Sequence, residues 1–394
     1  MVTAAANNQV VPRLRLGIVG GGKGAFIGAV HLTGARLDDR YQLVAGALSS
    51  DPQRAKESAP AFRIPDDRAY TSFQEMAEKE AKRADGIEAV IVATPNHTHF
   101  AICKAFLEAG IDVICDKPLT TTLADAVALV KLVKQTGLVF GLTHEYTAFA
   151  TVRQARAMVQ AGVLGKIRIV QAEYPQEWLA TKLEDTGAKQ ATWRTDPKKS
   201  GPAGSLADIG THGIHTARYI TGLELAEVCA DLSTFVPGRQ LDDNAHVLLR
   251  YKGGAKGMLW ASQCAPGTEN DLKVRVFGEK GSLTWQLRWP NELNFSPLDG
   301  PHQVLSRGRG TWLPLAQQAN HLPAGHPEGL HEAFAITYRD IADAIVERRY
   351  GIPAPEESKT FPDVESGARM VNFIEACVAS SQQGGKWIQL VSGP

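Results

Sequence analysis

One segment of the chain, residues 89–119, strongly limits the folds that the chain can adopt. It reads AVIVATPNHTHFAICKAFLEAGIDVICDKPL. An apolar run, a polar turn, a helix-like stretch and a second apolar run form the pattern of two parallel strands joined by a helix. The second run ends on Asp116, Lys117 and Pro118. Because ligands of open α/β sheets bind outside the carboxyl ends of the strands, we expect Lys117 at a ligand site.

Length and charge narrow the class of protein further. A chain of 394 residues favours two domains, and its 42 basic and 42 acidic residues create no overall field that would attract nucleic acid or an anionic membrane. The five cysteines are scattered, without a CxxC pair, as in reduced cytosolic proteins. The start of the chain lacks a signal-peptide pattern, and no apolar run reaches the roughly twenty residues of a membrane span. We therefore expect a cytoplasmic protein that binds a small molecule.

A glycine-rich turn near the N-terminus indicates a dinucleotide site. The apolar residues 14–19 lead into a glycine cluster at 20–24, and a helix carrying Gly28 follows. Glycines there let the backbone approach a pyrophosphate at a helix N-terminus. Gly20 and Gly22 match the first two glycines of GxGxxG, but Gly28 stands about three residues later than the third one should. A flexible surface loop is the alternative reading.

The end of the next strand bears on which cofactor binds. Residues 41–48 read as this strand, whose tip should carry an Asp or Glu for the ribose hydroxyls. Ser49 and Ser50 stand there instead, with Arg54 about one helical turn later. The acid typical of NAD sites is missing, yet no arginine follows at once for a 2′-phosphate. We expect NAD, with NADP as the alternative.

The strand at residues 86–94 is continuously apolar, as expected where helices cover both faces of a sheet. Its end opens the next helix with TPNHTH, where capping of the helix would by itself explain Pro95 and Asn96. The residues expected to contact the cofactor are Gly20, Gly22, Lys23, Gly24, Phe26, Ile27, Ser49, Ser50, Arg54, Thr94, Pro95, Asn96, His99, Asp116, Lys117 and His144.

The second part of the chain has a different pattern. From residue 167 to 286, short alternating strands joined by glycine turns predict a mostly antiparallel sheet. Residues 290–329 show little periodicity and read as a long excursion, in which Arg307 and Arg309 serve solubility or an interface. Residues 331–349 and 364–380 read as packing helices.

Together these patterns predict an α/β protein with two domains. A doubly wound parallel sheet of the Rossmann type is expected in residues 1–145. An α+β domain with an open, mostly antiparallel sheet is expected in residues 146–394 and would hold the substrate and the contacts between subunits.

Asp208 and His212 are candidates for proton transfer. If their segment is helical, the two side chains lie four residues apart on one face. A histidine suits removal of a hydroxyl proton because its pKa lies near operating pH, and a carboxylate can orient its ring. A helix cap with a surface pair is one alternative. A metal site that includes His215 is another.

The glycine-rich turn, the TPNHTH turn and the Asp-Lys-Pro tripeptide, in this order, resemble the Gfo/Idh/MocA family of oxidoreductases. The family's usual tripeptide is Glu-Lys-Pro, so Asp116 is a conservative variant. The resemblance implies that Lys117, Asp208 and His212 are the catalytic residues and that no metal takes part in hydride transfer. The stretches GAFIGAVH, ICDKPLTTT, DDNAHVLLR and GHPEG most resemble a levoglucosan dehydrogenase-like branch.

This resemblance implies reversible, NAD(P)-dependent oxidation of a secondary hydroxyl of a sugar, anhydrosugar or cyclic polyol to a ketone, at carbon 3 of a glucose-derived ring. His212 would act as base, Lys117 would polarise the oxygen and Asp208 would orient them. The residues expected to bind substrate are Lys117, Tyr146, Tyr174, Trp193, Arg194, Asp208, His212 and His326.

Two other functions use the same parts. One is a glycosidase that works through transient oxidation and elimination, and the other is a non-catalytic nucleotide-binding sugar sensor. We expect a homodimer or homotetramer, because an open sheet face would expose apolar surface. Nucleic acid and membranes are not expected partners.

Overall fold

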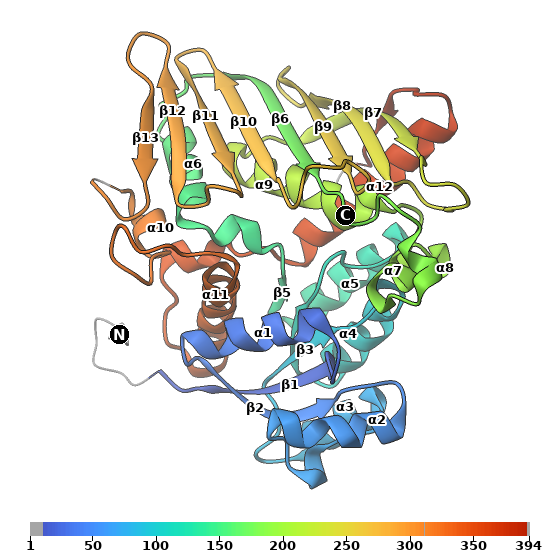
Figure 1. Ribbon diagram of the computed structural model, residues 1–394. Coiled ribbons are helices and arrows are strands. Elements are labelled where there is room, and N and C mark those ends of the chain that lie inside the picture. Colours follow the sequence, from blue (N-terminus) through green and yellow to red (C-terminus); the bar gives the residue numbers. More distant parts are fainter. Residues whose placement is uncertain (1–10, 311, 392–394) are drawn as a thin grey trace. The chain divides into compact units, whose positions relative to one another are not determined.

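The chain forms two compact units (Figure 1). The structure is a computed structural model that describes residues 11–310 and 312–391. The first unit contains residues 11–120, 124–145 and 330–367, and the second contains 121–123, 146–329 and 368–391. One division between the units falls after residue 145. The expectation that all of 146–394 belongs to the second domain is wrong, because residues 330–367 pack with the first unit.

The first unit is a five-stranded parallel sheet in the order β2-β1-β3-β4-β5. The strands are β1 (Leu14–Gly20), β2 (Tyr41–Ala47), β3 (Ala89–Ala93), β4 (Asp112–Cys115) and β5 (Phe140–Leu142). Its helices are α1 (Phe26–Leu37), α2 (Pro52–Ser58), α3 (Phe73–Lys82), α4 (His99–Glu108), α5 (Leu123–Thr136) and α11 (Leu330–Tyr350). Every residue of β3 and β4 is buried, as a strand covered on both faces requires.

Helix α11 completes the core of this first unit. Phe334, Tyr338, Ile341 and Ile345 belong to the same buried cluster as the apolar residues of β1 and β3. The fit is close at Gly141 of β5, where a Cβ atom would lie 2.2 Å from Cδ1 of Ile341. The helix predicted at residues 331–349 is therefore confirmed as a packing element, but its partner is the parallel sheet.

The second unit is built on a nine-stranded sheet in the order β13-β12-β11-β10-β6-β9-β8-β7-β14. Its strands are β6 (Ile167–Pro175), β7 (Leu225–Ser233), β8 (Asn244–Tyr251), β9 (Lys256–Ser262), β10 (Lys273–Gly278), β11 (Gly281–Gln286), β12 (Glu292–Pro297), β13 (Gln303–Ser306) and β14 (Ile388–Gln389). All pairs are antiparallel except β6 with β9. The predicted open, mostly antiparallel sheet is confirmed.

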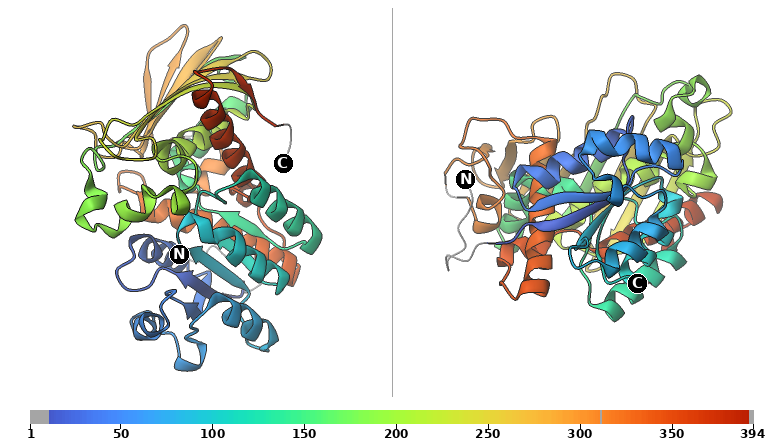
Figure 2. Two further views of the ribbon diagram at one scale, coloured as in Figure 1. Left: turned by 90° about the vertical axis from the view of Figure 1, so that its right-hand side faces the viewer. Right: turned by 90° about the horizontal axis from the view of Figure 1, so that it is seen from below.

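Helices cover one face of this sheet. They are α6 (Ala150–Gln160), α9 (Thr211–Thr221) and α12 (Val364–Gln382), and among the described elements none lies over the opposite face (Figure 2). On that opposite face Ile169, Leu248 and Met258 are exposed. No helix within residues 11–310 and 312–391 is long and apolar enough to cross a bilayer.

Two expectations about residues 290–329 are wrong. The stretch contains β12, β13 and the short helix α10 (Pro314–Gln317). Strand β13 has only four residues and none of them is buried, so the sequence shows no alternation of apolar and polar residues there. Arg307 is buried rather than a surface residue. Its guanidinium forms an ion pair with Glu328 at 2.8 Å and donates to Asn291 and Asn320 at 2.7 and 2.9 Å. It holds the loop after β13 together.

Candidate active site

The glycine-rich turn of the first unit is shaped by backbone conformations that glycine adopts readily. Gly20, Gly21 and Gly24 have φ angles of 81°, 67° and 82°. A Cβ atom on Gly28 would lie 2.3 Å from Cα of Gly21, so Gly28 is the glycine that lets the turn cross helix α1 closely. The longer spacing read from the sequence is therefore compatible with close packing between the turn and the helix.

The start of α1 suits an anionic group. Its N-cap residue, Ala25, makes no side-chain cap, and the first turn carries no acidic residue. The N-terminus of such a helix attracts negative charge. Lys23 and Phe26 are exposed beside it, and a Cβ atom on Gly22 would lie 2.5 Å from the carbonyl oxygen of Leu48. The turn and the helix start fit the pyrophosphate of a dinucleotide.

The tip of β2 carries Ser49, as expected from the sequence. Its hydroxyl accepts a hydrogen bond from the amide of Asp51 at 3.1 Å. The Asp51 carboxylate in turn accepts from the amide of Arg54 at 2.8 Å and so caps α2. The acid nearest to the strand tip is therefore used by a helix cap. Ser50 and Arg54 are exposed next to it.

His99 links the two turns that follow β3 and β4. It is buried, and its Nδ1 and Nε2 lie 2.8 Å from the Pro118 carbonyl and 2.9 Å from the Thr94 carbonyl. Both ring nitrogens thus contact carbonyl oxygens of the protein, which gives His99 a structural role. These two contacts account for the buried position of the His99 ring without a direct contact between its nitrogens and a cofactor. Pro95 and Thr98, the N-cap residues of the short turn before α4 and of α4 itself, make no side-chain cap.

The carboxyl ends of the parallel strands carry the remaining predicted cofactor residues. Gly20 is the last residue of β1, and Thr94, Lys117 and His144 come just after β3, β4 and β5; these four strands are neighbours in the sheet. All four therefore lie at the edge where ligands of such sheets bind. Glu145 is next in sequence and is buried. Burial raises its pKa to about 8, although the Lys117 ammonium opposes the rise.

In the second unit, His212 lies in the first turn of α9. The five residues before that helix, Leu206–Gly210, form a π-helical turn in which the amide of Thr211 donates to the carbonyl of Leu206. Such wide turns recur at functional sites. Asp208 lies in this turn, so the regular helix assumed for the Asp208 and His212 pair is replaced by a wider one.

A buried carboxylate holds the start of the π-turn. Asp242 accepts hydrogen bonds from the amides of Gly204 and Leu206 at 2.6 and 2.9 Å and from the Ser205 hydroxyl at 2.8 Å. Burial raises its pKa, against these three donors. A Cβ atom on Gly204 would lie 2.2 Å from the Asp242 carbonyl oxygen. Asp242 therefore fixes the segment that carries Asp208.

Two tyrosines surround the ring of His212. Its centroid lies 4.8 Å from that of Tyr146 and 6.2 Å from that of Tyr174, both edge-on. The two tyrosine hydroxyls are 2.7 Å apart, and Tyr174 donates to Asn270 at 2.7 Å. The structure thus brings together three residues predicted to bind substrate.

Asp208 has polar partners that the sequence did not indicate. Gln263 donates to its carboxylate at 2.8 Å, and Nε of Arg194 lies 3.3 Å from the same oxygen. The Arg194 guanidinium stacks on the Trp193 ring at 4.2 Å. Trp193 and Arg194, two further predicted substrate residues, therefore lie beside Asp208.

His326 and His215 have other surroundings. His326 is exposed in the loop held by Arg307, with Nδ1 3.3 Å from the Pro323 carbonyl, so its substrate role stays a prediction. Burial, with Arg218 and Arg369 nearby, lowers the pKa of His215 to about 3. In the described part of the chain, no three His, Cys, Asp or Glu side chains gather as metal ligands.

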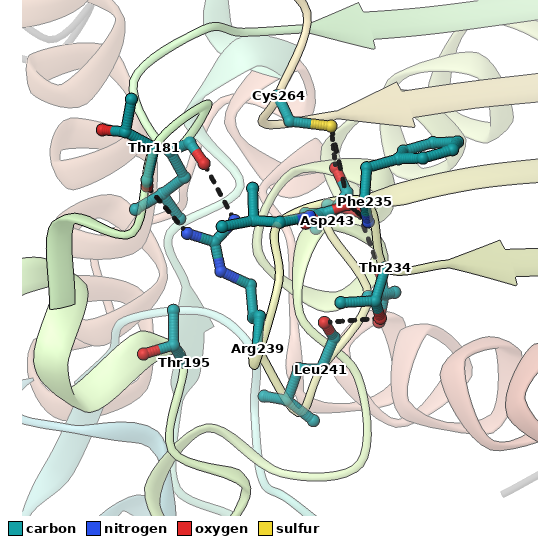
Figure 3. A network of polar contacts seen from close by, with 12 residues as sticks. Thr181, Thr195, Thr234, Phe235, Arg239, Leu241, Asp243 and Cys264 are labelled. Atoms are coloured by element: carbon teal, nitrogen blue, oxygen red, sulfur yellow. Dashed lines mark hydrogen bonds and ion pairs between the residues drawn. The ribbon is translucent and has the colours of Figure 1, made fainter. Parts of the chain in front are cut away.

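A buried arginine supports the loops on this side of the second unit (Figure 3). Arg239 donates to the carbonyls of Leu179 and Thr181 and pairs with Glu184 at 3.0 Å and with Asp243 at 3.2 Å. Asp243 also accepts the amide of Phe235 at 2.8 Å. We call Arg239, Glu184 and Asp243 the Arg239 network. It joins the loop before α7 (Lys189–Arg194) to the loop between β7 and β8.

Comparisons with known proteins agree with this geometry. Residues 14–144 match the family model described as "Oxidoreductase family, NAD-binding Rossmann fold", and residues 152–284 match the "GFO/IDH/MocA C-terminal domain". The oxidoreductase YfiI of Bacillus subtilis is 36% identical over 95% of this chain and 96% of its own length. A levoglucosan dehydrogenase of Pseudarthrobacter phenanthrenivorans is 28% identical over 71% of this chain and 75% of its own.

Solved structures are similar along nearly the whole chain. An inositol dehydrogenase homolog from Azotobacter vinelandii, complexed with NAD+, has a TM-score of 0.92 at 36% identity and covers 97% of this chain and 98% of its own. An oxidoreductase from Sinorhizobium meliloti has a TM-score of 0.87 at 48% identity and covers 96% and 99%. The chain therefore belongs to the Gfo/Idh/MocA family of oxidoreductases and carries its NAD-binding Rossmann fold.

Proposed function

We propose that the protein is an NAD-dependent dehydrogenase that reversibly oxidises a secondary hydroxyl of a cyclic polyol or sugar to a ketone. The observation that supports the proposal most is the cluster of Tyr146, Tyr174 and His212. His212 comes just after the π-turn that contains Asp208. A pyranose or inositol ring offers apolar faces to aromatic side chains and a rim of hydroxyls to polar ones. One of the similar structures, an inositol dehydrogenase homolog from Azotobacter vinelandii, is a complex with NADH and myo-inositol.

Three side chains have different roles in the proposed reaction. A ring nitrogen of His212 accepts the proton of the substrate hydroxyl, while the Lys117 ammonium stabilises the developing negative charge on that oxygen. Asp208, held by Gln263 and Arg194, keeps this group of side chains oriented. The hydride acceptor for the carbon-bound hydrogen would be supplied by NAD when bound. The C–H and O–H bonds break, a C=O bond forms, and the protein gains one proton.

The glycine turn, residues 20–27, would hold the pyrophosphate of this cofactor, and Ser49 would face the adenosine ribose. Both assignments rest on the open helix start and on the tip of β2 described above. Oxidation at carbon 3 of a glucose-derived ring is the finer proposal. The levoglucosan dehydrogenase supports it at 28% identity, and the inositol dehydrogenase homolog, at 36%, supports an inositol instead.

A direct test is to mix the purified protein with NAD and a panel of myo-inositol, levoglucosan and glucosides and to follow NADH. Net NADH formation with one of them supports a dehydrogenase. Glycoside cleavage without NADH would indicate the glycosidase, and cofactor binding without turnover of any ring would indicate the sensor. His212→Ala should lower kcat by about 10²- to 10⁴-fold. His246→Ala, on the outer sheet face, is the matched control.

We also propose that a second copy of the chain covers the outer face of the nine-stranded sheet, where Ile169, Leu248 and Met258 are exposed. Light scattering after size exclusion measures the assembly. A dimer or tetramer that dissociates in Leu248→Glu supports this proposal, and a monomeric wild type contradicts it.

A further inference from the structure

The side chain of Asp116 is attached directly to the backbone of Lys117. Its Oδ1 accepts hydrogen bonds from the Lys117 amide at 2.8 Å and from the Thr143 hydroxyl at 3.0 Å. The carboxylate therefore joins the turn after β4 to the end of β5. Any group that fixes the carboxylate also fixes the position from which the Lys117 side chain starts.

The other carboxylate oxygen faces a buried histidine. Oδ2 of Asp116 lies 3.9 Å from Nε2 of His31, which is fully buried on α1. Nδ1 of His31 lies 2.8 Å from the hydroxyl of Tyr338 on α11. When the Tyr338 hydroxyl donates to Nδ1, the proton of the neutral ring is on Nε2, which faces Asp116. At 3.9 Å this contact is electrostatic and longer than a hydrogen bond.

The charges around Asp116 keep it ionised. Burial alone raises the pKa of the carboxyl, but His31 and then Lys117 and His99 hold it well below its usual range. Burial also raises the pKa of Tyr338 far above its usual value, so the phenol stays neutral and able to donate. Glu145, the Cys115 thiol and the Tyr338 phenol also interact electrostatically with Asp116.

Helix α11 is attached near both ends of β4. At the start of the strand, the Asp112 carboxylate accepts from Arg348 at 2.7 Å and from Arg349 at 2.8 Å. Tyr338 lies ten residues before Arg348, about 15 Å along a helix, and Asp116 lies four residues after Asp112, about 13 Å along a strand. The helix and the strand thus match in length between the two attachments.

Close packing of α1 on α11 brings His31 to Tyr338. At Gly34, one helical turn after His31, an added Cβ atom would lie 2.7 Å from the Cβ of Phe334. The His31 ring also packs edge-on against the Phe334 ring at 5.3 Å. The absence of a side chain at residue 34 allows this approach between the helices.

We propose that Tyr338 and His31 are positioning residues for Lys117, acting through the Asp116 carboxylate. The hydroxyl of Tyr338 contacts the His31 ring at 2.8 Å, the ring faces the Asp116 carboxylate electrostatically at 3.9 Å, and that carboxylate accepts a hydrogen bond from the backbone amide of Lys117. The catalytic consequence of this series, which we call the Tyr338 relay, rests on the role proposed above for Lys117. Through the relay, a helix more than 200 residues later in the chain controls the placement of that side chain.

The test compares two buried tyrosines, Tyr338 of α11 and Tyr41 of β2. Tyr338→Phe removes the hydroxyl that contacts His31, whereas Tyr41→Phe removes an equally buried hydroxyl that donates to the backbone carbonyl of Tyr338 at 2.9 Å. We expect Tyr338→Phe to lower kcat about tenfold with the KM for NAD changed less than about twofold, and Tyr41→Phe to leave kcat unchanged. Asp116→Glu should retain more activity than Asp116→Asn.

A second readout does not depend on turnover. Competitive labelling of lysines with isotopic acetic anhydride, read by mass spectrometry, reports the reactivity of Lys117 in the folded protein. We expect it to change several-fold in Tyr338→Phe and in His31→Gln, while that of the exposed Lys134 stays constant. Equal Lys117 reactivity in Tyr338→Phe and Tyr41→Phe overturns the relay. Full turnover by Lys117→Ala would instead overturn the proposed function, and the labelling would still decide the relay.

Discussion

Replacement of Arg239 by methionine should destabilise the second unit strongly. Methionine keeps an unbranched apolar stem but removes a guanidinium that is 1% exposed and pairs with Glu184 and Asp243, themselves 11% and 1% exposed. Removing one partner of a buried ion pair costs about 3–5 kcal/mol. Asp243 keeps its hydrogen bonds from the amides of Phe235 and Val236 at 2.8 and 2.9 Å. We therefore expect a loss of about 3 kcal/mol.

Tryptophan fluorescence in urea measures this loss selectively. All seven tryptophans (Trp178, Trp193, Trp260, Trp285, Trp289, Trp312 and Trp387) belong to the second unit, so their emission reports its unfolding alone. Arg168→Met is the control, because Arg168 and Glu279 are 65% and 45% exposed at 3.8 Å, and such surface pairs contribute less than about 1 kcal/mol. Equal losses in the two variants would refute the reasoning.

Acid should shrink the difference between wild type and Arg239→Met. Burial raises the pKa of Glu184, but its hydrogen bonds to Arg239 outweigh burial and hold the pKa below its usual value. A group with a lowered folded-state pKa stabilises the fold above its unfolded pKa, and this stability is lost as pH falls through the folded value. The urea curves of the two proteins should therefore converge below about pH 4. A difference that stays constant down to that pH would contradict the ionic explanation.

Three further predictions concern single side chains. Gly28→Ala places a Cβ atom 2.3 Å from Cα of Gly21, and we expect weaker NAD binding by calorimetry together with about 1–3 kcal/mol less stability. Glu145 has a pKa raised to about 8, so folding stability falls by up to about 1.4 kcal/mol per pH unit between about pH 5 and pH 8, and Glu145→Gln should abolish this dependence in thermal unfolding. Gln263→Leu removes the 2.8 Å hydrogen bond to Asp208 and should lower kcat/KM about tenfold or more in steady-state assays.

Much of the fold followed from local patterns in the sequence. The apolar runs of β1, β3 and β4 are each followed by a helix, and this order predicted the parallel sheet. The prediction was possible because each of these patterns involves residues that are close together in the sequence. The return of α11 to that sheet was not predictable in this way. Its apolar residues show that the helix packs, but helical spacing contains no information about which sheet receives it.

The same distinction applies to the site. Lys117, Asp208 and His212 stand in short motifs, and Trp193 with Arg194 lies next to Asp208 as part of one local group. Gln263 was missed because it contacts Asp208 across 55 residues of sequence. His31 and Tyr338, 307 residues apart, were missed for the same reason. Isolated polar residues acquire such roles only through pairings that folding creates.

The π-turn and Arg307 show a second limit. A wide turn at Leu206–Gly210 depends on the Asp242 carboxylate, which fixes the preceding amides and lies more than thirty residues later. Arg307 looked like a surface residue because arginines are seldom buried, yet the carboxylate of Glu328 lies within 2.8 Å of it. In both cases one distant carboxylate decides the local structure.

The discontinuous first unit has a consequence for biosynthesis. By the time residue 145 leaves the ribosome, all five strands of the parallel sheet have been made, but α11, which supplies Ile341 and Ile345 to the core, ends only at residue 350. At about 5–20 residues per second, the sheet must wait roughly 10–40 s for its missing helix. During that interval its apolar surface is open to solvent while the second unit is being translated. A nascent chain of this protein is therefore a natural client for chaperones, and a fragment that stops at residue 145 should aggregate unless residues 330–367 are supplied.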